Sequence, residues 1–390
     1  MSGERESTVH RLATLRERLS SGMDRREFLR TAGAAGYGLG MAHLLGVDEF
    51  LATDDGEVPV VTALVREDPN DPWSLTERTR SVPADWYARV SKAFELHEKL
   101  AQASVTGYLA SAVTPGSYRQ GTASITVEAS TEDLDQVYTT LRRLFGDFSF
   151  DIEAIEDDID DLEDHGPQGE PTLAVDIDDG RVPGGVQCET GNGFATLTPA
   201  LYQPDGEHTF FATAEHAYYD QNASESSLYL SVEDDDPIEL GGVRYDHPVA
   251  DVVAVEPSGD LTPSSEIQGA EPSQVVGQFT RWGLADLAAR GQPLEKMGSQ
   301  TGYSSGQISG IDAITCFTDD FCRRGQVRWG DERDLTDGDS GSVAYHPDPE
   351  APDDGILVAS FNNARTWWPG QSFVWGIAAY QLTNKHGYHF

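Results

Sequence analysis

The C-terminal half of the chain consists of short strand-like segments separated by turn residues, and this pattern limits the fold more than any other feature. Apolar residues in these segments run together or alternate with polar ones, and Gly, Pro and Asp mark the breaks. The segments are residues 193–198, 209–213, 227–231, 251–255, 275–279, 356–361 and 373–377. Short, regularly spaced strands predict a mostly β sandwich or barrel for residues 182–390.

A small α+β unit is predicted before this region, over residues 58–155. Apolar spacing predicts a helix over residues 83–103 and a second helix that starts at Ser130 or Thr131. Alternation predicts a strand over residues 124–128. We interpret the apolar stripes as core, because no catalytic constellation accompanies them. The acidic segment 156–180 contains Gly and Pro and is predicted to be an extended linker to the β region.

The N-terminal segment, residues 1–50, has the pattern of an export signal. The paired Arg25 and Arg26 precede a Gly/Ala-rich, modestly apolar run over residues 31–47. This arrangement resembles a twin-arginine signal, and the run is too short and too rich in glycine for a membrane span. We therefore expect a secreted protein and leave this segment out of the fold.

The charge balance is extreme, with 66 Asp and Glu against 27 Lys and Arg, a formal net charge of −39. Acidic residues recur along the whole chain, so nucleic acid is not expected as a partner, because its phosphates would be repelled. A surface of this kind is typical of adaptation to high salt, where screening weakens the self-repulsion of the protein.

The chain has three cysteines, too few for a disulfide framework. Cys316 and Cys322 are close enough in sequence to close a local loop in an exported protein, which would leave Cys188 as a buried thiol. Three free thiols are an equally open alternative.

Three segments carry the side chains of a nucleophilic site. Ser340 lies in Gly-Asp-Ser-Gly-Ser, residues 338–342, where the glycines permit the tight bend that presents a hydroxyl beside backbone N–H groups. His216 follows an apolar strand and can exchange a proton near neutral pH. Asp251 directly precedes a buried apolar strand, where its carboxylate needs a partner such as an imidazole N–H.

Other residues compete for these roles. Asp246 could be the acid, but it precedes His247 and a proline and not an apolar strand. We interpret His208 and His247 as surface or structural histidines. A zinc site that includes His208 and His216 would need three converging ligands, and the sequence has no metalloprotease helix pattern. No metal and no cofactor are expected.

The order His216, Asp251, Ser340 resembles that of the chymotrypsin-like serine proteases. The local sequences agree: Thr-Ala-Glu-His ends at His216, an apolar strand follows Asp251, and Gly-Asp-Ser-Gly surrounds Ser340. Residues 296–306 resemble a segment of the bacterial streptogrisin and α-lytic protease branch. The resemblance implies two six-stranded antiparallel barrels over residues 182–390, preceded here by the α+β domain.

The resemblance also implies residue roles. Ser340 would be the nucleophile, His216 the general base and then the acid, and Asp251 the group that fixes the imidazole tautomer. The backbone N–H groups of Gly338 and Ser340 would form the oxyanion hole. Asp339 would be a buried structural carboxylate, with a basic residue as its partner in bacterial members.

Two further substrate contacts are weaker expectations. Ser360 would line the S1 site, and Asp334 would be an S1 acid unless it is only surface charge. The sequence departs from the family pattern at Ser342, which replaces a glycine, and at Ala217, which replaces a cysteine.

The sequence therefore predicts a secreted, monomeric serine endopeptidase that cleaves protein or peptide substrates. By position, residues 58–155 would be an accessory domain or the pro-region of a zymogen, acting as an intramolecular chaperone or inhibitor. The alternatives are a catalytically inactive binding protein on the same scaffold and an esterase-like acyl hydrolase. The sequence does not give the cleavage specificity, the mature N-terminus or the signal cleavage site.

Overall fold

The computed structural model describes residues 56–390 except 104, 120–121, 156–169, 176, 178, 192, 204–206, 220–221, 234–235, 319–320 and 366–370. The predicted export signal and most of the predicted linker lie outside the described residues. No helix in the described part of the chain is long and apolar enough to cross a membrane.

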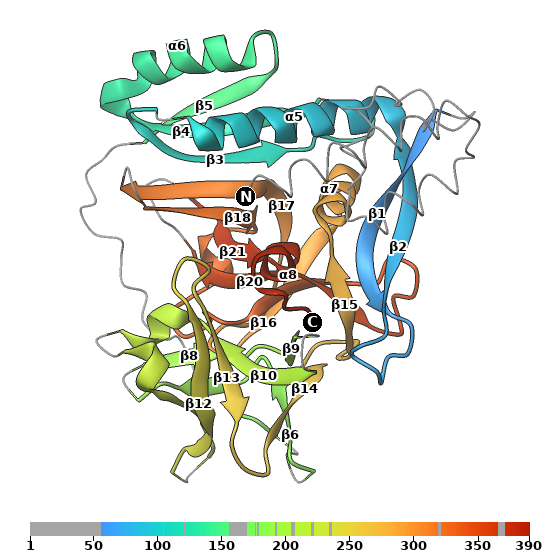
Figure 1. The fold of residues 1–390 in the computed structure, drawn as a ribbon, viewed down its shortest axis with the longest axis vertical. Helices are drawn as coiled ribbons and strands as arrows, with labels where there is room; N and C mark the ends of the chain where they lie inside the picture. Colours follow the sequence, from blue (N-terminus) through green and yellow to red (C-terminus); the bar gives the residue numbers. More distant parts are fainter. Residues whose placement is uncertain are drawn as a thin grey trace, which may run out of the picture.

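The C-terminal barrel is a closed ring of antiparallel strands in the middle of the molecule (Figure 1). Its pairs are β16–β17, β17–β18, β18–β21, β21–β20, β20–β19 and β19–β16. These strands are β16 (Pro293–Gly298), β17 (Gly302–Thr318), β18 (Phe321–Trp329), β19 (Val343–Pro347), β20 (Ile356–Ala364) and β21 (Val374–Ala378). Helix α8 (Ala379–His386) follows β21 and packs against it and β20.

The first barrel along the chain lies at the bottom of Figure 1 and contains a sheet in the order β8-β7-β11-β12-β13-β10-β9. These strands are β7 (Gln187–Glu189), β8 (Phe194–Thr196), β9 (Leu201–Gln203), β10 (His208–Thr213), β11 (Ser227–Leu230), β12 (Ile238–His247) and β13 (Val252–Pro257). β8 and β9 follow one another along a bent stretch of chain. Between them, Thr198 N–H donates to Ala212 O of β10. This hydrogen bond joins the β8 end of the sheet to β10 and closes the barrel. The short parallel pair of β6 (Arg181–Gly184) and β14 (Thr262–Ile267) lies beside it.

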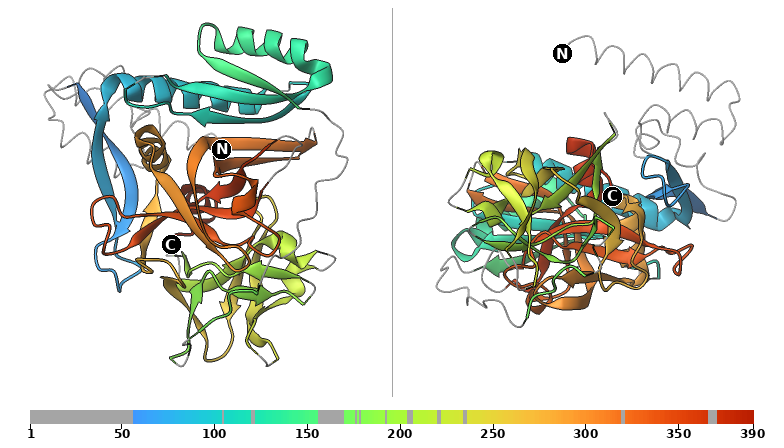
Figure 2. Two further views of the ribbon diagram at one scale, coloured as in Figure 1. Left: turned by 180° about the vertical axis from the view of Figure 1, so that it is seen from behind. Right: turned by 90° about the horizontal axis from the view of Figure 1, so that it is seen from below.

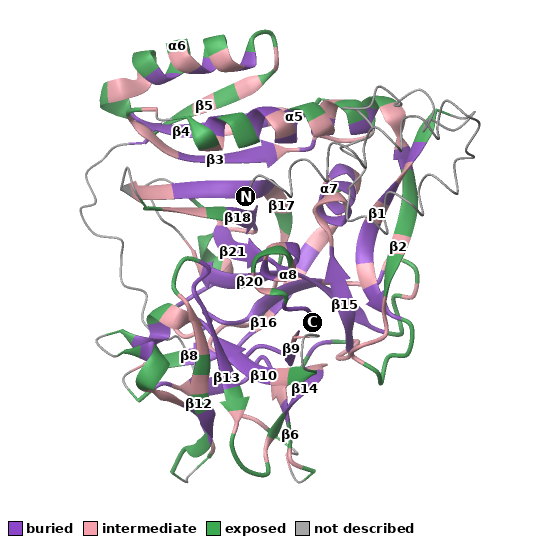
Figure 3. Cartoon of the chain, in the orientation of Figure 1, coloured by how far each residue is buried: buried purple, intermediate pink, exposed green. Residues whose placement is uncertain are grey.

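The prediction of a mostly β fold with two antiparallel six-stranded barrels is therefore confirmed. The alternation of buried and exposed residues produces it, because each strand sends one set of side chains into a barrel core. Figure 3 shows the buried residues concentrated along the strands of both barrels.

The N-terminal unit adds strands to both sides of the C-terminal barrel. β1 (Glu57–Arg66) and β2 (Leu75–Pro83) form a hairpin that pairs with β15 (Val275–Phe279), which itself pairs with β20. β3 (Tyr108–Thr114) pairs with β17, and β4 (Ser124–Ser130) and β5 (Phe150–Ile155) extend the sheet outward. Helix α5 (Ala84–Gln102) joins the two halves, and α6 (Leu134–Phe145) covers the outer sheet, as the left view of Figure 2 shows.

The two parts of the chain share one hydrophobic core. Trp86 of α5 stands edge-on to Trp282 of α7 (Arg281–Arg290), with ring centroids 6.0 Å apart. Glu128 of β4 forms an ion pair with Arg328 of β18, and both side chains are almost completely buried. Residues 58–155 therefore form a continuous sheet and core with the C-terminal barrel.

Candidate active site

The candidate base His216 lies in the short 3-10 turn η2 (Glu215–Tyr218), just beyond the end of β10. Its Nδ1 donates to Asp251 Oδ2 at 2.8 Å, and its backbone N–H donates to Asp251 Oδ1 at 2.9 Å. Because a carboxylate can only accept, the proton of the neutral ring lies on Nδ1 and the lone pair on Nε2. Nε2 can therefore act as a base, and the side chain is 44% exposed.

Strand pairing brings Asp251 to His216. β10 and β13 are antiparallel neighbours, and Thr213, three residues before His216, lies opposite Val253, two residues after Asp251. Asp251 has φ 58°, a left-handed conformation that aspartate tolerates better than most residues. Its side chain is completely buried. Burial alone would raise the pKa of Asp251, but the hydrogen bond from His216 and the charges of His216 and Arg323 hold it below its ordinary value.

The rival acid Asp246 has a different partner. Its Oδ2 accepts from Ser224 Oγ at 3.3 Å. The ring of His208 lies 5.9 Å from that of Phe210, and His247 Nε2 lies 3.0 Å from the Tyr388 hydroxyl. In the described part of the chain, no group of three or more His, Cys, Asp or Glu is arranged to hold a metal ion.

Ser340 lies in the turn before β19, and Thr196 of the first barrel holds this turn. Thr196 N–H donates to Ser340 O, and Thr196 Oγ1 donates to Gly338 O, both at 2.8 Å. Gly341 has φ 95°, and a Cβ there would lie 2.1 Å from Thr196 O and 3.3 Å from Ala214 N. The turn thus packs against the strand end that precedes His216. Its close approach explains why Gly341 carries no side chain.

The structure shows no hydrogen bond between His216 and Ser340 among the described residues. Catalytic hydrogen bonds in substrate-free sites are often long and tighten only when substrate binds. Gly338 has φ 91°, and neither Gly338 N–H nor Ser340 N–H donates to another group in the described part of the chain. The oxyanion hole that the resemblance implies from these two donors stays a prediction.

Asp339, the residue before Ser340, is completely buried and fixes the turn. Its carboxylate accepts from Lys296 Nζ at 2.9 Å and from the backbone N–H groups of Gln300, Thr301 and Thr336 at 2.9 to 3.1 Å. Lys296 is the basic partner that the resemblance implied without naming a residue. The alternation along β16 sends it into the core, and burial lowers the pKa of Lys296 despite the opposing charge of Asp339.

The two weaker substrate residues have structural contacts. Asp334 Oδ2 accepts from Asp331 N–H at 2.8 Å, so this carboxylate caps the turn η4 (Glu332–Asp334). Ser360 is completely buried in β20, and its hydroxyl donates to Asn362 Oδ1 at 3.3 Å. Neither contact identifies a substrate pocket, so the S1 roles of these residues stay predictions.

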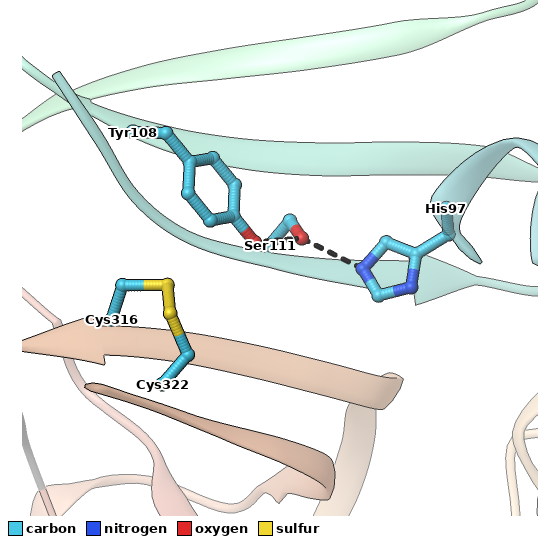
Figure 4. The surroundings of a disulfide bond; sticks show 5 residues. All are labelled: His97, Tyr108, Ser111, Cys316 and Cys322. Carbon is cyan, nitrogen blue, oxygen red and sulfur yellow. Dashed lines mark hydrogen bonds between the residues drawn. A yellow bond between two sulfur atoms is a disulfide. The ribbon is translucent and has the colours of Figure 1, made fainter. Parts of the chain in front are cut away.

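The structure has the disulfide that was one of the two alternatives for the cysteines. A disulfide joins Cys316 and Cys322 across the end of the β17–β18 hairpin, and Cys188 is a free, buried cysteine. Figure 4 shows the disulfide facing the strand that carries Tyr108 and Ser111.

Sequence reasoning missed two residues of the site. Thr196 has no motif that marks it, because its role depends on the contact between the barrels. Arg323 Nη1 donates to Asp251 Oδ2 at 2.8 Å, and its position in a hairpin far along the chain gave no signal.

Comparisons with known proteins find similar structures but no similar sequences. No protein-family model and no curated protein sequence matches the chain. Protease A of Thermobifida fusca is similar over 53% of this chain and 97% of its own, with 15% identity and a TM-score of 0.37. The chymotrypsin of Cellulomonas bogoriensis covers 54% of this chain and 98% of its own, with 14% identity and a TM-score of 0.36. The MamO protease domain of Magnetospirillum magneticum, in its apo form, covers 51% of this chain and 94% of its own, with 11% identity and a TM-score of 0.33. At these identities and TM-scores the likeness says nothing about catalytic activity.

Proposed function

We propose that the chain is an exported chymotrypsin-like serine endopeptidase. The observation that carries this proposal is the hydrogen bond from His216 Nδ1 to the buried carboxylate of Asp251, made where the Ser340 turn packs against the same barrel. A buried aspartate on the far nitrogen of an exposed imidazole sets the tautomer that a general base needs.

The proposed reaction has two halves. Ser340 Oγ attacks the carbonyl carbon of a peptide bond while His216 Nε2 takes the hydroxyl proton, and the backbone N–H groups of Gly338 and Ser340 stabilise the oxyanion. The carbon–nitrogen bond then breaks, and His216 returns its proton to the leaving amine. Water, deprotonated by His216, then attacks the acyl-enzyme; the bond between the acyl carbon and Ser340 Oγ breaks, His216 returns the proton to Ser340 Oγ, and the acid leaves.

Export and processing are further parts of the proposal. The twin-arginine pattern in residues 24–47 supports export, and the acidic composition supports work in high salt. Residues 58–155 act as an accessory domain or intramolecular chaperone that helps the C-terminal barrel to fold, a role supported by the pairing of β3 with β17 and by the ion pair between Glu128 and Arg328.

A fluorophosphonate probe tests the nucleophile. We expect the purified protein in high salt to gain one probe mass, which peptide mapping places on Ser340. Ser340→Ala and His216→Ala should take up none, whereas Ser258→Ala, at an exposed serine of the first barrel, should label like the wild type. A folded wild type that takes up no probe would exclude a serine hydrolase that uses Ser340 as its nucleophile.

A binding protein on the same scaffold is the second candidate. Two observations favour it: His216 and Ser340 share no hydrogen bond in the described structure, and Arg323 also occupies the carboxylate of Asp251. This candidate predicts a folded protein that captures peptides without labelling or cleavage.

A further inference from the structure

The β17–β18 hairpin brings a cation to the candidate triad. Arg323 lies in β18, and its Nη1 donates to Asp251 Oδ2, the same oxygen that accepts from His216 Nδ1. The Arg323 side chain is 12% exposed and that of Asp251 is completely buried. Water therefore screens this ion pair less than it screens a surface pair.

Three features of the fold hold Arg323 in place. Cys322, the preceding residue, is bonded to Cys316. Arg323 lies opposite Thr315 of β17, and Thr315 lies opposite Ala110 of β3, so one rung of the sheet joins the hairpin to the N-terminal unit. Figure 4 shows this disulfide end of the hairpin beneath β3.

The third feature lies further along β18, where Arg328 pairs with Glu128 of the N-terminal unit inside the protein. The strand that carries Arg323 is thus held by the disulfide at the end of the hairpin, by its pairing with β17 and through it β3, and by the ion pair of Arg328 further along. The planar guanidinium of an arginine is itself pre-organised, so little side-chain freedom is lost for each hydrogen bond that it forms with a carboxylate.

We propose that Arg323 is a positioning residue of the catalytic triad, held against Asp251 by the disulfide-closed hairpin and by the N-terminal sheet. The proposal rests on the proposed function, because Arg323 has this task only if His216 is a general base. Arg323 would do two things. Its hydrogen bond fixes the carboxylate so that Oδ2 stays opposite His216 Nδ1, and its charge offsets the negative charge that favours the imidazolium.

The charged groups around His216 decide the direction of the second effect. Burial lowers the pKa of His216, the hydrogen bond and charge of Asp251 raise it, Arg323 lowers it and Glu215 raises it, with a net rise. Burial and the negative charges of Asp251 and Asp246 raise the pKa of Glu215 in turn. Arg323 is thus the one cation among these described groups, and its loss should raise the pKa of His216 further.

The test compares Arg323→Gln with Arg324→Gln, which removes the same charge at the next, exposed residue of the strand. The first measurement is an NMR titration of His216 in a Ser340→Ala background, which needs no activity. The second is the labelling rate with a fluorophosphonate probe as a function of pH.

We expect Arg323→Gln to move both the titration of His216 and the acid limb of labelling to higher pH. The labelling rate at neutral pH should fall by about ten- to a hundred-fold, because the imidazole is less well placed. Arg323→Lys should recover much of the pH shift, since it keeps the charge, and Arg324→Gln should match the wild type. Coincident titrations and profiles for Arg323→Gln and Arg324→Gln would overturn the proposal.

A second pair of variants tests the support. Cys316→Ser with Cys322→Ser should shift the profile in the same direction but less, and an unchanged profile would overturn the role of the disulfide. If Arg323→Gln does not fold, Arg323→Lys and the double serine variant supply the comparison. A wild type that takes up no probe at any pH would contradict the proposed function, while the His216 titration would still show whether Arg323 lowers the pKa of His216.

Discussion

Lys296 Nζ lies 2.9 Å from Asp339 Oδ2, and both side chains are completely buried. This pair joins β16 to the turn that carries the candidate nucleophile. Two buried charges cost desolvation energy, and here the cost is offset by mutual attraction and by the backbone N–H groups that also reach Asp339. The pair therefore ties the shape of the proposed oxyanion hole to the core of the C-terminal barrel.

Removal of the cation should damage both stability and the site. Lys296→Met leaves Asp339 as an unpaired buried charge, which should lower the free energy of unfolding by about 3–5 kcal/mol. Chemical denaturation measures this change, and probe labelling should fall with it. Lys92→Met is the matched control, because the exposed pair of Lys92 and Glu95 should contribute less than about 1 kcal/mol. Equal stability of the two variants would contradict the role of the pair.

The acid of the triad can be distinguished from its rival by two matched variants. Asp251→Asn replaces an acceptor with an amide that favours the wrong tautomer of His216, so the labelling rate should fall by about a thousand-fold or more. Asp246→Asn should change it less than about threefold, because Asp246 contacts Ser224 and not the ring. Labelling rates at one pH check both values. A larger loss of labelling rate for Asp246→Asn than for Asp251→Asn would show that Asp246, and not Asp251, is the acid.

The pH dependence of labelling should show a single acid limb. The charge and hydrogen bond of Asp251 hold the pKa of His216 above its ordinary value of 6.5, while Asp251 itself, with a lowered pKa, stays charged over the same range. Because the base must be neutral, labelling should increase with pH through the pKa of His216. Stopped labelling followed by mass spectrometry measures the midpoint. A midpoint below 6.5 would show that the contact between His216 and Asp251 does not control the base.

The N-terminal unit should behave as part of the folded protein and not as a separate domain. After a cut within the predicted linker, the two fragments should elute together and separate only in denaturant, because they share a sheet and a core. Fragments that separate in native buffer would contradict this account.

The buried pair in that interface gives a sharper form of the same test. Glu128→Gln should destabilise the intact chain by about 3–5 kcal/mol, since it leaves the charge of Arg328 buried without its partner. Glu153→Gln, at an exposed position of β5, should change stability by less than about 0.5 kcal/mol. Denaturant unfolding curves of both variants measure these changes in the free energy of unfolding. Equal stability of the two variants would contradict the role of the buried pair.

Local sequence patterns predicted most elements that have a clear period. The helix expected over residues 83–103 is α5, and the strand that follows Asp251 is β13. The β1–β2 hairpin was not predicted, because many of its residues are half-buried or exposed and its partner β15 lies far along the chain. The pairing of β3 with β17 was missed for the same reason: register between distant strands leaves no local signal.

The candidate site divides in the same way. His216, Asp251 and Ser340 lie in short motifs with a strand or a turn as context, so their residue types and order were informative. Thr196 and Arg323 act across the packing of separate elements and carry no motif. The structure places His216 and Asp251 in contact, whereas the substrate roles of Asp334 and Ser360 stay predictions, because both side chains make structural contacts.

Cleavage of an unfolded protein substrate in high salt tests the central claim most directly. Mass spectrometry of the products should show internal fragments with the wild type and an intact substrate with Ser340→Ala, each enzyme sample being shown to be folded by circular dichroism. An intact substrate with the folded wild type, or the same fragments with Ser340→Ala, would contradict a serine endopeptidase that uses Ser340.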